Sequence, residues 1–113
     1  MSTISTHVLD TALGGPASGI PLTLERRDGG RWTLIGGGTT DDDGRVPSLL
    51  DRGVEFGPGT YRMTFETSAY LKRRHDGGFY PVVRVEFEVD DAAEHYHVPL
   101  LLSPYGYSTY RGS

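Results

Sequence analysis

Residues 83–89 read Val-Arg-Val-Glu-Phe-Glu-Val, so apolar and charged side chains alternate strictly along this stretch. Successive side chains of a β-strand point to opposite faces of a sheet. The alternation therefore predicts a strand from Val83 to Val89, with one apolar face toward a core and one charged face toward water. The Asp90-Asp91 pair that follows is typical of a turn and closes the stretch.

Four more strands are predicted where residues suited to one buried face recur at every second position. These sets are Ile4, Thr6 and Val8; Ile20, Leu22 and Leu24; Tyr61, Met63 and Phe65; and Val98, Leu100 and Leu102. A further strand is expected from about Arg31 to Gly36, where the glycines at 36–38 are expected to interrupt it. A closing hairpin is expected around residues 103–106.

One helix is expected, over Ser68–Arg73, with the basic run at residues 72–75 as its solvated end. Sixteen glycines and seven prolines are spread along the chain, which is typical of turns between many short strands. Seven or eight short strands with one helix predict an all-β sandwich.

Composition excludes several classes of protein. The 113 residues fit a single domain, which we expect to cover residues 1–113. A formal net charge of −4 argues against a nucleic-acid partner, because such proteins usually carry a basic patch. Without cysteine there is no disulfide, thiolate metal ligand or cysteine nucleophile. The first residues lack a secretory pattern, and no apolar run approaches about 20 residues, so we expect a cytoplasmic protein without a membrane partner.

Two histidines mark the face where chemistry is expected. His95 and His97 lie two positions apart on a predicted strand, so they project to the same side, about 6.8 Å apart along its axis. Val98 and the positions in phase with it take the core, so His97, Pro99 and Leu101 are expected to lie exposed or against a partner. Because Leu101 is apolar, the sequence predicts an oligomer contact on this face.

Histidine and arginine together suit the hydrolysis of a small acidic ring. Histidine titrates near neutrality and can act as base or acid, and arginine supplies a fixed set of donors for a planar anion. Two alternatives remain open: ordinary surface histidines, and a metal site in which His7 joins His95 and His97. A serine nucleophile lacks a Gly-x-Ser-x-Gly motif, and residues 36–38 lack the lysine and helix of a phosphate loop.

Residues 97–113 read His-Val-Pro-Leu-Leu-Leu-Ser-Pro-Tyr-Gly-Tyr-Ser-Thr-Tyr-Arg-Gly-Ser, and they resemble the C-terminal signature of the 5-hydroxyisourate hydrolases. The last four residues match the characteristic Tyr-Arg-Gly-Ser ending of these transthyretin-related proteins. Residues 5–10, 15–17 and 40–45 resemble the other motifs of the family in the same order. The resemblance covers essentially the whole chain.

The resemblance implies a transthyretin-like β-sandwich of two four-stranded sheets with one short helix, assembled as a homotetramer that is a dimer of dimers. It implies cofactor-free and metal-free active sites where two dimers meet, with His7, Arg45 and His97 as catalytic residues. It further implies that Tyr110 binds substrate together with His7 and Arg45, and that Ser113 borders the site as a catalytic member.

The implied activity is hydrolysis of 5-hydroxyisourate to 2-oxo-4-hydroxy-4-carboxy-5-ureidoimidazoline in urate degradation. One histidine would take a proton from water while Arg45 holds the substrate, and the division of roles between His7 and His97 stays open. His95 is expected only to support its neighbour. The nearest competing function is hormone carriage by the transthyretins, which share the Leu-Leu-Ser-Pro-Tyr type of hairpin. The carriers have lysine, glutamate and threonine where this chain has His7, Arg45 and His97.

Overall fold

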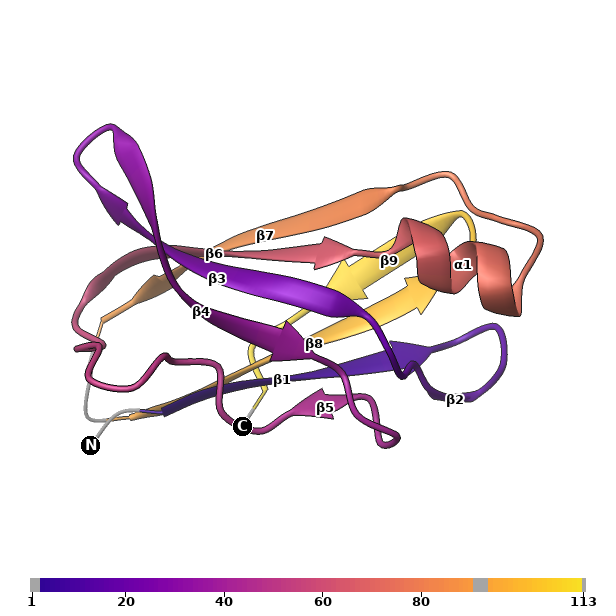
Figure 1. The fold of residues 1–113 in the computed structure, drawn as a ribbon, viewed down its shortest axis with the longest axis horizontal. Coiled ribbons are helices and arrows are strands. Elements are labelled where there is room, and N and C mark those ends of the chain that lie inside the picture. The colour runs from indigo at the N-terminus through magenta and orange to yellow at the C-terminus, as the bar shows by residue number, and fades with distance from the viewer. Residues whose placement is uncertain (1–2, 91–93, 113) are drawn as a thin grey trace.

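The computed structural model describes residues 3–90 and 94–112, which form nine strands and one short helix (Figure 1). In chain order the elements are β1 (Thr3–Asp10), β2 (Gly15–Pro16), β3 (Pro21–Asp28), β4 (Arg31–Thr39), β5 (Arg45–Val46), β6 (Gly59–Glu66), α1 (Ser68–Arg74), β7 (Val82–Val89), β8 (His95–Ser103) and β9 (Gly106–Thr109). The predicted β-rich fold with one short helix is confirmed.

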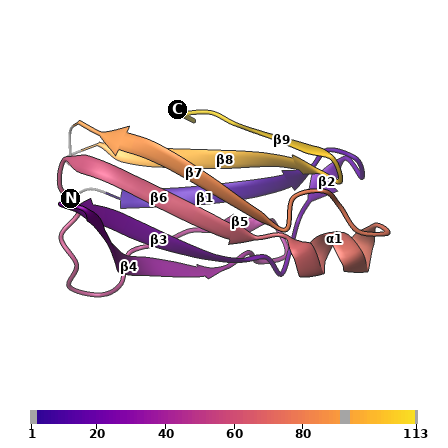
Figure 2. The ribbon, with the colours of Figure 1, turned by 90° about the horizontal axis from the view of Figure 1, so that it is seen from above.

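The strands form two sheets, and α1 lies at one end of them (Figure 2). One sheet has the order β4-β3-β6-β7, and all its pairs are antiparallel. The other has the order β2-β1-β8-β9, with β5 pairing β1 as a fifth strand. The expectation of four strands in each sheet is wrong for this second sheet, which has five. Two of its strands, β2 and β5, have only two residues each and lie among turn-forming residues, so they show no alternating pattern in the sequence.

The core is built from the alternating residues of both sheets. Its fully buried side chains include Ile4 and Val8 from β1, Leu24 from β3, Tyr61, Met63 and Phe65 from β6, Val83 from β7, and Leu100 and Leu102 from β8. The two-residue periodicity of the sequence is confirmed in these strands, because their in-phase residues all point inward. The opposite faces of β1 and β8 are consequently free to carry a site.

The glycines at 36–38 lie inside β4 and do not interrupt it. This strand continues to Thr39 and pairs with β3, with a register shift between Leu24 and Glu25. A Cβ on Gly36 would lie 1.7 Å from the backbone oxygen of Leu49. Glycine is therefore needed here because another segment of backbone approaches closely, a non-local reason that the sequence pattern does not reveal.

Pro99 is buried within the chain itself, so the expectation that this position of β8 lies exposed or against a partner is wrong. Its register partner on β1 is His7, and Thr109 of β9 donates a hydrogen bond to the Pro99 carbonyl at 2.7 Å. The neighbouring strands thus cover this proline within one chain. Leu101 is half-buried, and it remains available for a contact with another copy.

The basic run at the end of α1, residues 72–75, is only partly solvated. Lys72, Arg73 and Arg74 are exposed in the last turn of the helix, as expected. His75 instead turns inward, and its Nε2 lies 2.8 Å from an oxygen of the buried Asp10 on β1. The prediction of a solvated end is therefore wrong for His75, because Asp10 is buried and needs hydrogen-bond donors, and Tyr70 and His75 supply them to its Oδ2.

Candidate active site

The short strand β5 brings Arg45 beside His7. These two residues are register partners in the antiparallel pairing of β5 with β1. The preceding turn is held by Asp41, whose Oδ1 accepts hydrogen bonds from the backbone N–H groups of Asp43 and Arg45 at 2.9 and 3.0 Å. The acidic turn in the sequence therefore serves to place Arg45 on the outward face of the sheet.

The same turn orients the imidazole of His7. Its Nε2 lies 2.9 Å from the backbone oxygen of Asp43. A carbonyl oxygen can only accept, so we assign the proton of neutral His7 to Nε2. Its Nδ1 is then left as the acceptor, which is the form that a general base requires.

His97 lies on the same outward face, on β8. Its register partner in the parallel pairing with β1 is Ser5, and the Ser5 hydroxyl oxygen lies 2.9 Å from His97 Nδ1. The imidazole is half-buried. With Nδ1 turned toward Ser5, Nε2 is the ring nitrogen left to meet a substrate or water.

Burial and neighbouring cations lower the pKa of His97. Burial disfavours the charged ring, and the positive charges of Arg45, His7 and His95 act in the same direction, partly offset by a hydrogen bond with the backbone of Ser5. His97 is therefore neutral at neutral pH, as a base must be. His7 and Arg45 are therefore near enough to His97 to act on it electrostatically.

The C-terminal segment lies directly over His97. The Gly112 N–H donates to the His97 backbone oxygen at 2.8 Å, and a Cβ on Gly112 would lie 2.6 Å from His97 Cδ2. Arg111, next to it, donates to Glu94 at 2.6 Å and lies over the ring of Tyr96 at 4.6 Å. The glycine of the terminal tetrapeptide is required because no side chain fits between the backbone and the imidazole.

Two predicted site residues are not brought to His97 by the described part of the chain. Tyr110 is exposed and lines a pocket of about 180 Å³ together with Phe87, Tyr96 and Val98. Tyr96 and Val98 point inward from β8, so this pocket is on the side away from His97. Ser113 lies outside the described residues, and the roles predicted for both residues stay predictions.

The structure adds three residues that the sequence analysis did not single out: Ser5, which contacts His97; Asp43, whose carbonyl holds His7; and Gly112, which covers His97. A signal for Ser5 was present, because Ser5 and His7 are two positions apart and share a face. For Gly112 and Asp43 the contact depends on how distant segments meet, which the periodicity does not encode.

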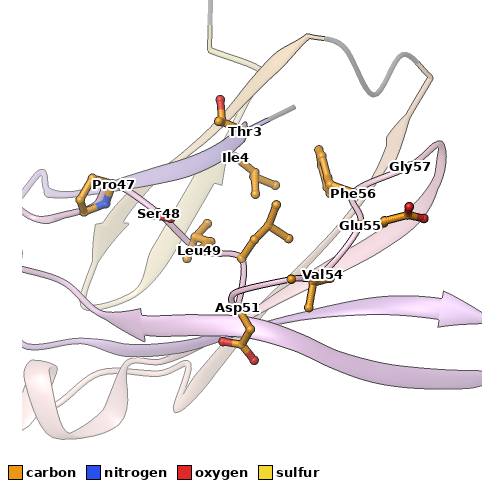
Figure 3. Close-up of a pocket in the computed structure, with 12 residues that line it drawn as sticks. Thr3, Ile4, Pro47, Ser48, Leu49, Asp51, Val54, Glu55, Phe56 and Gly57 are labelled. Atoms are coloured by element: carbon orange, nitrogen blue, oxygen red, sulfur yellow. The ribbon is translucent and has the colours of Figure 1, made fainter. Parts of the chain in front are cut away.

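A large pocket lies apart from this cluster. It has a volume of about 830 Å³ and is enclosed by residues 47–57 and the start of β1 (Figure 3). Ile4, Leu49 and Phe56 point toward one another in it, and all three are buried core residues. Most of the lining is apolar, and its two carboxylates, Asp51 and Glu55, have no histidine, lysine or arginine with them in the lining, so we place the chemistry at His7, Arg45 and His97.

Residues 3–90 and 94–112 hold no group of three or more histidine or acidic side chains arranged to bind a metal ion. No helix in the same part of the chain is long and apolar enough to cross a membrane.

The family and two kinds of relative were identified by comparison with known proteins. Residues 4–112 match the model of the HIUase/Transthyretin family. A 5-hydroxyisourate hydrolase from Salmonella dublin is 46% identical over 110 residues, which are 97% of this chain and 80% of that protein. The structure of Klebsiella pneumoniae 5-hydroxyisourate hydrolase is similar with a TM-score of 0.84, 33% identity and full coverage of both chains.

A transthyretin is also similar in fold. Sea bream transthyretin, solved in complex with thyroxine, gives a TM-score of 0.89 at 32% identity, over 97% of this chain and 94% of that one. A family match over nearly the whole chain, with both kinds of relative sharing the sandwich, leads to one conclusion: the chain belongs to the HIUase/Transthyretin family.

Proposed function

We propose that this protein hydrolyses 5-hydroxyisourate in urate degradation, opening its six-membered ring to give 2-oxo-4-hydroxy-4-carboxy-5-ureidoimidazoline. The 46% identity to a protein named 5-hydroxyisourate hydrolase supports the substrate. The observation that carries the proposal is the meeting of His7, Arg45 and His97 on one outward face, with the pKa of His97 lowered by its burial and by the neighbouring charges.

The mechanism uses water as nucleophile. A neutral histidine, at His97 Nε2 or His7 Nδ1, takes a proton as water attacks the ring carbonyl. Arg45 holds the substrate and stabilises the negative charge that develops on the attacked oxygen. The C–N bond then breaks, the other histidine, which enters the step protonated, donates its proton to the leaving nitrogen, and the carbonyl carbon becomes a carboxylate. No cofactor or metal enters this scheme.

The cluster stands on the exposed face of a sheet, and we propose that another copy of the chain completes it. A homotetramer built as a dimer of dimers would place two such faces against each other and exclude water from the reacting groups. The half-buried Leu101 lies on this face. Tyr110 and Ser113 would join the site to bind substrate and border it.

Carriage of a hydrophobic ligand is the competing function, and the fold itself does not separate the two. The TM-score to thyroxine-bound sea bream transthyretin, 0.89, is no lower than the 0.84 to the Klebsiella hydrolase. The side chains favour hydrolysis. Two histidines and an arginine can move protons and stabilise an oxyanion, whereas ligand carriage needs neither.

The test generates fresh 5-hydroxyisourate from urate with urate oxidase and follows the loss of its ultraviolet absorbance with and without the purified protein. We expect decay faster than the spontaneous rate, unchanged by a chelator and reduced about 10²- to 10⁴-fold in His97→Ala. Decay at the spontaneous rate would overturn the proposal and favour carriage. Activity lost only with chelator would instead indicate a histidine metal site.

A further inference from the structure

A line of hydrogen-bonding side chains leads away from His97 on the outward face of β1 and β8. The Ser5 hydroxyl oxygen lies 2.9 Å from His97 Nδ1 and 3.1 Å from His95 Nε2. The hydroxyl of Thr3 contacts the other ring nitrogen of His95, Nδ1. His97 is therefore linked through a single hydroxyl to a second histidine.

The parallel register of the two strands builds this line. Thr3 lies opposite His95, and Ser5 lies opposite His97. All four side chains share one face, because they occupy alternate positions of their strands. The two imidazole rings are nearly parallel, at 17°, with centroids 6.5 Å apart. This spacing lets one hydroxyl group reach a nitrogen of each ring.

The number of protons available decides which group donates and which accepts in each of these hydrogen bonds. A serine hydroxyl has one proton, so Ser5 donates to one histidine and accepts from the other. Nδ1 is the nitrogen of His97 that lies against the Ser5 hydroxyl, so a ring that acts as a base through Nε2 carries its proton at Nδ1 and donates it to that hydroxyl oxygen. The Ser5 proton is then donated to Nε2 of His95, and His95 Nδ1 donates to Thr3.

His95 thereby decides where the Ser5 proton goes. If His95 did not accept it, the hydroxyl could turn and donate to His97 Nδ1, and the His97 proton would move to Nε2. That nitrogen would no longer be a base. Because His95 and Thr3 are both exposed, their hydrogen bonds compete with water and add little to stability. The main effect of these hydrogen bonds is therefore on which nitrogen of His97 carries the proton.

We propose that His95 is a positioning residue: it accepts the Ser5 proton and so keeps Nε2 of His97 free to act as the base. This inference rests on the proposed function, because the direction of the hydrogen bonds follows from His97 Nε2 acting as the base. The tautomer of His97 can nevertheless be measured in the protein without substrate.

The direct test is long-range ¹H–¹⁵N NMR of the histidine rings at about pH 8.5, above the ordinary histidine pKa, with His97 assigned from a His97→Asn spectrum. We expect the Nδ1–H form of His97 in the wild type and a large Nε2–H population in His95→Ala. The double variant Ser5→Ala/His95→Ala should lose this excess of the Nε2–H form, because no hydroxyl is left to donate to Nδ1. An unchanged tautomer in His95→Ala would overturn the proposal.

Kinetics provide the second test. We expect His95→Ala to lower kcat about 10- to 100-fold with little change in KM, since a misplaced proton disables the base without removing a substrate contact. Adding Ser5→Ala should restore part of that loss, and His95→Gln should retain most activity because its amide oxygen accepts from Ser5. Thr3→Val serves as the control at the far end of the line.

Two outcomes separate this inference from the proposed function. A kcat of His95→Ala within about twofold of the wild type, or a double variant worse than His95→Ala, would overturn the positioning role in an active hydrolase. If the wild type does not hydrolyse 5-hydroxyisourate, the proposed function fails while the tautomer measurement still decides the role of His95. Melting temperatures of all variants exclude loss of folding as the cause.

Discussion

His97 shows how several weak local influences combine on one side chain. Its ring is half-buried, Ser5 lies at one nitrogen, and the backbone of Gly112 lies over it. Arg45 and His7 add positive charge nearby. Each contact is ordinary by itself. Together they fix the orientation of the ring and favour its neutral form.

The pH dependence of activity follows from the lowered pKa of His97. Burial first, and then the charges of Arg45, His7 and His95, disfavour protonation, so the base form persists below the ordinary histidine pKa of 6.5. We expect the acid limb of kcat/KM, which reports the free enzyme, to have its midpoint below 6.5. In Arg45→Gln the acid limb of the residual kcat/KM should have its midpoint at a higher pH. In Arg45→Lys the positive charge is kept, so the midpoint should stay where it is in the wild type. A midpoint above 6.5 in the wild type would contradict this assignment.

A single methyl group at Gly112 should disturb the site. A Cβ there would lie 2.6 Å from His97 Cδ2, so either the terminal segment or the imidazole must shift. We expect Gly112→Ala to lower kcat/KM about 10- to 100-fold with little change in melting temperature. Gly106→Ala is the matched control, because its Cβ would make only an ordinary contact, 3.8 Å from the Ser103 hydroxyl. Equal activity of the two variants would show that the terminal segment does not position His97.

At the scale of elements, a buried carboxylate fastens α1 to the end of β1. Asp10 accepts hydrogen bonds from the Tyr70 hydroxyl at 2.7 Å, from His75 at 2.8 Å, and from the backbone of Ala12 and Leu13 at 3.0 Å. Burial raises the pKa of Asp10, but these hydrogen bonds and the charge of His75 outweigh it and lower the pKa. Burial and the bond to Asp10 raise the pKa of Tyr70 to about 12, so its hydroxyl keeps its proton.

Removing the Tyr70 hydroxyl should destabilise the protein in a pH-dependent way. Because the folded-state pKa of Asp10 is depressed, its contribution to stability is present above the unfolded-state pKa and is lost as the pH falls through the folded value. We expect Tyr70→Phe to cost about 1 to 3 kcal/mol of unfolding free energy at pH 7, and less near pH 3.5. Urea unfolding at both pH values measures this, with the exposed Tyr105→Phe as control. A loss that is equal at the two pH values would refute the link to the Asp10 carboxylate.

The sequence predicted well those strands whose side chains only have to face the apolar core, whatever residues they meet there. Met63 and Phe65 needed only to point inward, and alternation is enough to show that. The features that were missed depend on one particular distant neighbour. Gly36 faces the backbone of Leu49, and His75 reaches Asp10 across 65 residues. A pattern in one segment carries no information about which other segment arrives beside it.

The residues of the candidate site also fall into those that the sequence indicates and those that depend on a distant neighbour. His7, Arg45 and His97 could be named because the family resemblance carries them, and the structure places them on one face. Ser5 was not named, since a serine in a strand is unremarkable until its register partner is known. The β1 and β8 register supplies that partner, and no local sequence signal sets a parallel register between distant strands.

At the scale of the whole molecule, assembly and activity should fail together. Leu101 is half-buried on the face of the catalytic cluster, and a charge there should oppose contact with a second copy. We expect Leu101→Glu to lower the tetramer fraction in sedimentation velocity and to lower hydrolysis in proportion. Leu34→Glu is the control, because Leu34 is 61% exposed on β4 of the other sheet. Full activity in isolated Leu101→Glu dimers would show that each site is complete without the second dimer.

The parallel pairing of β1 with β8 also sets the order in which the protein can be made (Figure 1). Ser5 and His97 are 92 residues apart, so β1 leaves the ribosome well before its partner strand exists. At about 5 to 20 residues per second this wait lasts on the order of 5 to 20 s. Until β8 arrives, the edge of β1 that will pair with it has no partner strand, and such an edge can pair with other chains. The candidate site therefore forms only once β8 has paired with β1, so the activity of the protein should report that this pairing is complete.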